Sequence, residues 1–196
     1  MKALKLLATV FTAMVFLSAC KESPGTAEAT KQATVEPVSI AAIEAGARGF
    51  TVGSTMSVRT VYVFFDPQCP HCALLWQSAK PLRSQTKFVW IPVGLINKTS
   101  EAQGATLLAA KDPVSAMDEH EASILAKGGG ISASGDFEPL KAAVVKNTAL
   151  MNRFGFASVP SIVALHAQSG ALVTREGSMP TPALASFLGL QVPAGQ

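Results

Sequence analysis

Two cysteines three positions apart, Cys69 and Cys72, are the residues of this chain best suited to chemistry. They follow an apolar run of β-branched and aromatic residues, 61–65, which ends at Asp66 and Pro67 and is typical of a buried strand. The residues after Cys69 favour a helix. We therefore expect Cys69 at a helix N-terminus and Cys72 one turn further along the same face.

The spacing of this pair suits thiol–disulfide exchange. Side chains at positions i and i+3 of a helix are neighbours, so Cys69 and Cys72 can close a disulfide of ordinary geometry. Unpaired backbone N–H groups and the positive end of the helix dipole favour a thiolate at Cys69, and the thiolate is the nucleophile of disulfide exchange. A protonated His71 would add to this effect. We expect an exposed Cys69 that attacks and a more buried Cys72 that resolves the mixed disulfide.

The elements that must hold the pair are strands and covering helices. The patterns predict, in order, a short helix over 38–47, an edge strand or hairpin over 50–58, a strand over 59–65, a helix over 70–84 kinked at Pro81, and a strand over 87–96. Three helices follow over 101–111, 113–127 and 136–154, then a hairpin over 161–166 and 171–175 and a closing helix over 180–190. This order predicts an α/β protein with a thioredoxin-like fold and a helical insertion between the second strand and the hairpin.

Composition agrees with a folded domain and argues against one class of partner. Of the 196 residues, 48% are apolar and 15% charged, which is enough apolar surface for a core. No basic patch is interleaved with aromatic residues, so nucleic acid is not expected as a partner. Trp76 and Trp90 are expected in the core, His120 on a solvated helix face, and His166 in a structural position.

Residues 1–19 have the pattern of an export signal. A basic start at Lys2 and Lys5 precedes an apolar run of about 12 residues, too short to span a membrane. The run ends in Leu-Ser-Ala-Cys, which resembles the lipobox of bacterial lipoproteins, where cleavage precedes the cysteine and Cys20 is then acylated. An ordinary secretory peptide is the alternative. Lys21 after the cysteine favours the outer over the inner membrane.

The segment between this signal and the folded part is predicted to be a flexible tether. Residues 20–37 hold too little apolar surface to offset the entropy of ordering them. An N-terminal helix and edge segment is then expected over 38–58, and a catalytic domain over 59–196 with the helical insertion at about 98–156. The predicted location is the periplasm, with a lipid anchor in a membrane.

Two motifs together resemble the Dsb thiol–disulfide oxidoreductases, and in particular the catalytic domain of the DsbG and DsbC branch. The first is Phe-Phe-Asp-Pro-Gln-Cys-Pro-His-Cys at 64–72, and the second is Ala-Ser-Val-Pro-Ser at 157–161. The resemblance covers residues 58–190. It implies that Val159 and Pro160 form a cis-proline loop that faces the cysteines and binds an extended substrate.

The same resemblance assigns further residues around the pair. Pro70 and His71 tune the reduction potential, and the Pro-His pair is that of DsbA, a strong oxidant. DsbC and DsbG carry threonine before the cis-proline, whereas DsbA carries valine, as this chain does at Val159. The direction of exchange is therefore open. Asp66 is either a carboxylate that relays protons near the pair or a cap at the strand end, and we favour the cap.

These features lead to one main hypothesis. The chain is expected to be an envelope enzyme that exchanges disulfides with cysteine-containing envelope proteins and with a redox partner of the DsbD or DsbB type. It needs no cofactor other than its own Cys69–Cys72 disulfide. DsbC and DsbG dimerise through an N-terminal domain that residues 20–58 are too short to supply, so we expect a monomer that acts as an oxidase or reductase rather than a dimeric isomerase.

A binding module is the alternative from another class. Zinc would require two ligands beyond the cysteine pair, and the chain has no second Cys-x-x-Cys and no His-x-x-x-His. Copper(I) is soft and accepts two thiolates. A periplasmic thioredoxin-fold module that holds copper(I) or a partner without turnover therefore stays open beside the enzyme, although we predict no metal site.

Overall fold

The computed structural model describes residues 35–133, 135 and 137–192. The predicted signal peptide, Cys20 and most of the predicted tether lie outside these residues. The described part contains a five-stranded sheet in the order β1-β3-β2-β4-β5. Its strands are β1 (Phe50–Gly53), β2 (Thr60–Phe65), β3 (Lys87–Pro92), β4 (Ser161–Leu165) and β5 (Leu172–Glu176). Its helices are α1 (Ile40–Gly46), α2 (Pro70–Ala79), the 3-10 helix η1 (Lys80–Leu82), α3 (Ser100–Ala109), α4 (Pro113–Leu125), α5 (Glu138–Arg153) and α6 (Thr181–Leu188).

The central strand β2 is buried on both sides. It pairs in parallel with β3 and antiparallel with β4, with Phe64 opposite Ile91 on one side and Ser161 on the other. Such a strand needs apolar residues on both faces, which explains the continuous apolar run before the cysteines. The α/β class, the order of the elements along the chain and the three inserted helices agree with the prediction from the sequence.

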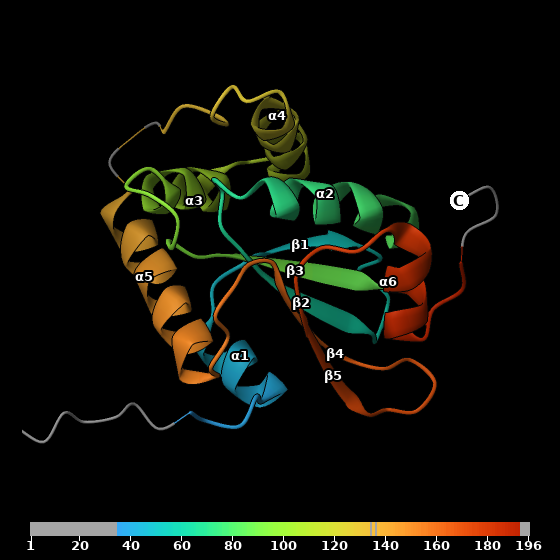
Figure 1. The fold of residues 1–196 in the computed structure, drawn as a ribbon. Helices are drawn as coiled ribbons and strands as arrows, with labels where there is room; N and C mark the ends of the chain where they lie inside the picture. Colours follow the sequence, from blue (N-terminus) through green and yellow to red (C-terminus); the bar gives the residue numbers. More distant parts are fainter. Residues whose placement is uncertain (1–34, 134, 136, 193–196) are drawn as a thin grey trace, which may run out of the picture. The chain divides into compact units, whose positions relative to one another are not determined.

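Alternate residues of β2 enter two separate cores. Val61, Val63 and Phe65 pack with residues of α2 and α6 on one face. Tyr62 and Phe64 pack on the other face, with apolar residues of α1 and α5. Figure 1 shows α2 along one face of the sheet, with α1 and α5 against the other. Both cysteines belong to the α2 core, so the pair is built into the apolar interior on that side.

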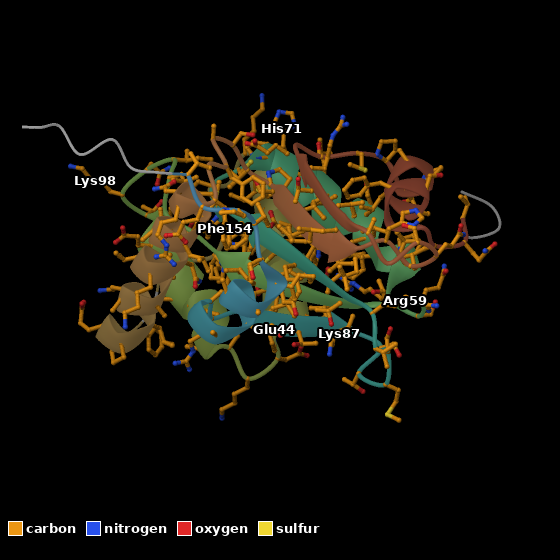
Figure 2. All side chains as sticks on the ribbon, turned by 90° about the horizontal axis from the view of Figure 1, so that it is seen from below. Glu44, Arg59, His71, Lys87, Lys98 and Phe154 are labelled. Atoms are coloured by element: carbon orange, nitrogen blue, oxygen red, sulfur yellow. The ribbon has the colours of Figure 1, made fainter. Side chains whose placement is uncertain are left out.

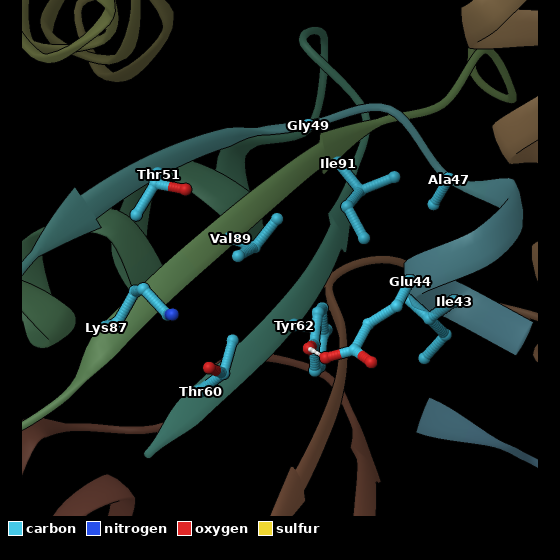
Figure 3. A pocket seen from close by; sticks show the side chains of 10 residues that line it. All are labelled: Ile43, Glu44, Ala47, Gly49, Thr51, Thr60, Tyr62, Lys87, Val89 and Ile91. Carbon is cyan, nitrogen blue, oxygen red and sulfur yellow. Dashed lines mark hydrogen bonds between the residues drawn. The ribbon is translucent and has the colours of Figure 1, made fainter. Parts of the chain in front are cut away.

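The opposite face of the sheet carries a hollow between α1 and strands β2 and β3 (Figure 3). Tyr62 crosses it and donates a hydrogen bond of 2.5 Å to Glu44 Oε1. Burial, together with this carboxylate, raises the pKa of Tyr62 to about 12. Because Tyr62 and the cysteines point to different cores, this hollow is separated from the cysteine pair by the sheet.

Two element ends have clear physical causes. Helix α2 ends at Ala79 and continues as a 3-10 turn because Pro81 cannot donate a backbone hydrogen bond. Strand β3 ends at Pro92, whereas the sequence predicts a strand to residue 96. The N–H groups of Leu95 and Ile96 turn away to Asp66 Oδ2, at 2.6 and 2.9 Å. In the part of the chain that the structure describes, no helix has both the length and the apolar character needed to cross a bilayer.

Candidate active site

Cys69 occupies the N-cap of helix α2, as the sequence predicts. Its N–H donates to the carbonyl of Asp66 at 3.0 Å, which closes the turn between β2 and α2. Pro70 takes the first helical position, where its missing N–H would have had no intrahelical partner. The N–H of Cys72 donates to the Cys69 carbonyl at 3.0 Å, and both cysteines are free thiols.

The expectation of an exposed Cys69 is wrong. Cys69 is 4% exposed and Cys72 is fully buried. The cause is the loop before β4, because the carbonyl of Val159 lies 3.5 Å from Cys69 Sγ and accepts its S–H. The exposed residues of the motif are Pro70 and His71. Figure 2 shows His71 projecting from the surface.

The two sulfurs have opposite electrostatics. A hydrogen bond from the Cys72 thiol, with backbone N–H groups of Cys72 and His71, lowers the pKa of Cys69 to about 7, against the effects of burial and of the Asp66 charge. Burial raises the pKa of Cys72 well above its ordinary value. Near neutral pH, a large share of Cys69 is therefore thiolate, whereas Cys72 keeps its proton.

The loop that covers Cys69 contains a cis peptide bond between Val159 and Pro160. The bond has the geometry that the resemblance implies. The loop is tied to β5, because Glu176 Oε2 accepts the N–H groups of Ala157 and Ser158 at 3.0 and 2.6 Å. This anchoring holds the Val159 carbonyl next to the sulfur.

Asp66 is fully buried and its carboxylate accepts four hydrogen bonds. Oδ1 accepts the Gln68 N–H at 2.8 Å and the Ser100 hydroxyl at 2.7 Å. Oδ2 accepts the two N–H groups of the loop after β3. The carboxylate thus fastens the turn before Cys69 to the start of α3 and to that loop, which agrees with the cap rather than with a proton relay.

The expectation that His120 lies on a solvated helix face is wrong. It is fully buried, its Nε2 lies 2.6 Å from the Pro67 carbonyl, and its Nδ1 accepts the Ile131 N–H at 3.1 Å. The acidic neighbours suggested a solvated face. The signal that could have found it is the apolar spacing of Met117 and Ile124, which places His120 on the same face of α4.

Gln68 and Gln103, which the sequence did not single out, add hydrogen bonds to the contact between His120 and the turn before Cys69. Gln68, next to Cys69, donates to the side chain of Gln103 and to the Gly129 carbonyl. Gln103 donates to the carbonyls of Gly129 and Ile131, each at 2.8 Å. Gly130 between them has φ of +82°, and a side chain there would collide with the His120 ring. The loop after α4 therefore clamps the turn that carries Cys69.

The donor set at the site offers little to a metal ion. Across the described residues, no group of three or more histidine, cysteine, aspartate or glutamate side chains is placed to share one. Cys69 and Cys72 are two sulfurs on one helical turn, a set that only a low-coordinate soft ion would accept.

A reactive cysteine at a helix N-terminus, a buried second cysteine and a facing cis-proline loop on a mixed sheet define the thioredoxin class of redox domain. The chain belongs to the thioredoxin-like domain family, whose model matches residues 54–190. It is 36% identical to the thiol:disulfide interchange protein DsbG of Pseudomonas aeruginosa over 143 residues, which are 70% of this chain and 54% of that protein. It is 42% identical to DsbG of Escherichia coli over 65 residues, 32% of this chain and 26% of that protein.

The chain thus spans about half the length or less of these curated relatives. Solved structures agree on the fold. A disulfide interchange protein from Neisseria gonorrhoeae matches with a TM-score of 0.54 and 20% identity, over 72% of this chain and 93% of that one. DsbA2 of Pseudomonas aeruginosa matches with a TM-score of 0.58 and 19% identity, over 70% of this chain and 91% of that one. A periplasmic thioredoxin-like protein from Salmonella enterica matches with a TM-score of 0.59 and 15% identity, over 79% of this chain and 97% of that one.

Proposed function

We propose that this protein is a bacterial envelope thiol–disulfide oxidoreductase that exchanges disulfides with protein substrates through Cys69 and Cys72. The observation that carries the proposal is the difference between the two sulfurs. Hydrogen bonds lower the pKa of Cys69 to about 7, while burial keeps Cys72 protonated. The similarity to proteins named thiol:disulfide interchange proteins supports the same activity.

Cys69 is the sulfur that bonds to the substrate. In the reducing direction, its thiolate attacks a substrate disulfide, one substrate sulfur leaves, and Cys72 then attacks Cys69 Sγ to release the other. In the oxidising direction, a substrate thiolate attacks Cys69 Sγ and Cys72 leaves. A pKa near 7 makes Cys69 both a competent nucleophile and a good leaving group at neutral pH.

The cis-proline loop binds the substrate chain beside the sulfur. The Val159 carbonyl, 3.5 Å from Cys69 Sγ, is a hydrogen-bond acceptor for the backbone N–H of an extended substrate. Once Cys69 has lost its proton, the sulfur no longer donates to this carbonyl, so it is free for the substrate. Pro70 and His71 form the exposed border of the entrance and tune the potential.

The residues near the pair favour one-way exchange over isomerisation. The Pro70-His71 pair and Val159 match the oxidising DsbA type, whereas a Cys69 pKa of about 7 is that of a reducing thioredoxin, so we assign oxidation or reduction of selected envelope proteins ahead of isomerisation, with a DsbB-like or DsbD-like partner restoring the pair. The location is the periplasm, which similarity to DsbG and to a periplasmic thioredoxin-like protein supports. Acylation at Cys20 would hold the domain at a membrane.

Turnover of a model substrate tests the proposal. The full chain should oxidise a dithiol peptide in a glutathione buffer or reduce insulin, and Cys69→Ser should lose both activities. Cys20→Ser is the matched control, since it removes a thiol outside the described domain, and it should keep the activity. If Cys69→Ser retained wild-type turnover, the proposal would fail. Tight binding of one copper(I) by a chain without turnover would favour the binding module instead.

A further inference from the structure

Helix α4 of the insertion touches the active-site segment on both sides of the cysteine pair. His120 Nε2 contacts the Pro67 carbonyl, two residues before Cys69. Asp118 Oδ1 accepts a hydrogen bond of 2.7 Å from Trp76, one turn beyond Cys72. The face of α4 between these contacts is therefore directed at the pair.

Glu121 lies on this face of α4. It is one helical turn after Met117, which packs in the same apolar core as Cys69 and Cys72. The residue is fully buried, and neither of its carboxylate oxygens has a hydrogen-bond partner among the residues that the structure describes. A buried carboxyl group without partners is costly, so its presence in this core calls for a role.

The charge state of Glu121 is coupled to the cysteines. Burial, and then the charge of Cys69, raises the pKa of Glu121 to about 9. The charge of Glu121 in turn contributes to the high pKa of Cys72, behind the larger effects of burial and of Cys69. At neutral pH the group is an uncharged acid that can give a proton to a neighbouring sulfur.

We propose that Glu121 is the proton donor and acceptor for Cys72 during disulfide exchange, supplied to the active site by the helical insertion. This inference rests on the proposed function, because it assigns a step within that reaction. It gives the inserted α4 a chemical role in addition to its contacts with Pro67 and Trp76.

The step balances in both directions. During oxidation of a substrate, its thiolate attacks Cys69 Sγ, the Cys69–Cys72 bond breaks, and the electron pair goes to Cys72 Sγ, which takes the proton of Glu121. A second substrate thiolate then attacks the substrate sulfur of the mixed disulfide and expels Cys69 as a thiolate. The substrate leaves as a disulfide, its two electrons stay on the cysteine pair, and Glu121 regains a proton from solvent. In the reverse reaction, the Glu121 carboxylate takes the proton of Cys72 as that sulfur attacks Cys69.

Other charged groups near α4 are engaged elsewhere or lie outside its buried face. Asp66 is saturated with hydrogen bonds, His120 is bonded through both ring nitrogens, and Asp118 pairs with Lys80 at 2.6 Å. The remaining titratable or charged residues on α4 and on the segments that face it are Cys69, His71, Cys72, Arg83, Glu101 and Glu119. Cys69 and Cys72 are the buried sulfurs among these groups that change protonation in the reaction, and Cys69, with a pKa of about 7, leaves as a thiolate without an acid, so Cys72 is the sulfur that requires a proton donor.

The test compares Glu121→Gln with Glu119→Gln, an exposed glutamate on the same helix, in the full chain. Tryptophan fluorescence would follow reduction of the oxidised chain by a dithiol peptide in stopped flow. We expect Glu121→Gln to slow formation of the reduced pair at pH 7 by about 100-fold, the usual size of a lost general acid. Glu119→Gln should keep the wild-type rate. Glu121→Leu, which is apolar and of similar size, guards against misfolding of the first variant and should be equally slow.

Proton uptake separates a chemical role from a structural one. The Cys69 thiolate exists only in the reduced pair, and its charge raises the pKa of Glu121. The pKa of Glu121 is therefore higher after reduction than before, so at about pH 8 Glu121 takes up a fraction of a proton when the pair is reduced. Both Glu121 variants should lose this fraction.

The possible outcomes separate the role of Glu121 from the disulfide-exchange activity itself. A slow reaction and lost proton uptake in folded Glu121 variants would support the inference. Wild-type rates and uptake in either folded variant would overturn it while leaving the proposed function standing. A wild-type chain that does not exchange disulfides with the peptide at all would instead overturn the proposed function and, with it, the role of Glu121.

Discussion

At the scale of single residues, the two cysteines owe their different chemistry to what surrounds each sulfur. Cys69 receives hydrogen bonds from the Cys72 thiol and from backbone N–H groups, and Cys72 is enclosed by apolar side chains. A thiolate therefore forms at Cys69, which the cis-proline loop faces, and a proton stays on Cys72, which reacts only with Cys69.

The first prediction concerns the pKa of Cys69. In the reduced Cys20→Ser variant, iodoacetamide should modify Cys69 and leave Cys72 unmodified, at a rate that rises through about pH 7. Cys72→Ala should move this midpoint upward because it removes the largest stabilising hydrogen bond, whereas Cys72→Ser, which keeps a donor, should move it less. A wild-type midpoint near the ordinary thiol value of 9.0 would contradict the geometry.

The second prediction concerns the stability cost of Glu121. Its pKa is raised from 4.5 to about 9 on folding, so between these values the folded state holds a proton that the unfolded state releases. Stability therefore falls as pH rises through this window, by up to about 1.4 kcal/mol for each pH unit. Glu121→Leu should raise the free energy of unfolding more at pH 8 than at pH 5, as measured in urea. An equal gain at both pH values would contradict the raised pKa.

At the scale of elements, the insertion determines how rigidly the β2–α2 turn is held. The insertion reaches that turn through His120, through Gln103 and through Ser100 at the start of α3. These contacts join residues 34 to 53 positions apart in the sequence. The turn that carries Cys69 is thus clamped by side chains from outside the βαβ unit.

The third prediction follows from that clamp. His120→Ala should lower the free energy of unfolding by about 2–4 kcal/mol, because it leaves the Pro67 carbonyl and the Ile131 N–H buried without partners and opens a cavity. Glu119→Ala, at the exposed neighbouring position, should change stability by less than about 0.5 kcal/mol. Urea unfolding measures both. Equal losses in the two variants would show that the His120 contacts do not hold the turn.

Local sequence patterns predict the elements better than the contacts between them. The apolar run of β2 and the position of Cys69 at the start of α2 follow from composition and spacing along the chain. The end of β3, the burial of His120 and the isolation of Glu121 do not, because each depends on groups that only tertiary packing brings together. A polar run on α4 predicts solvent, but His120 is covered by the turn at Pro67, 53 positions away, and by the loop at Ile131, 11 positions away.

At the scale of the whole molecule, the chain combines a redox domain with an N-terminal segment outside the described residues. We propose that the segment places the active site at a membrane through Cys20. Confinement near a surface would restrict the enzyme to envelope proteins, and a monomer would present its single cysteine pair without a second copy to shield it.

The fourth prediction tests this placement. In cells, the wild-type chain should sediment with membranes and enter the detergent phase on partition, because acyl chains at Cys20 would anchor it. Cys20→Ser should move the protein to the soluble periplasmic fraction or leave it unprocessed, and Cys69→Ser should behave as wild type. A soluble wild-type protein would contradict the anchor.

Light scattering of the purified chain should give the mass of one copy, and twice that mass would contradict the predicted monomer.

The mixed disulfide between Cys69 and a substrate can be trapped and identified. Cys72→Ala removes the sulfur that resolves the mixed disulfide, so this variant should accumulate in cells as adducts with envelope proteins that a reductant dissolves. Mass spectrometry of the trapped adducts should find the bond at Cys69, and Cys69→Ala with Cys72 intact should trap none. If Cys72→Ala formed no such adducts, or formed them through a different residue, Cys69 would not be the sulfur that exchanges disulfides with substrates.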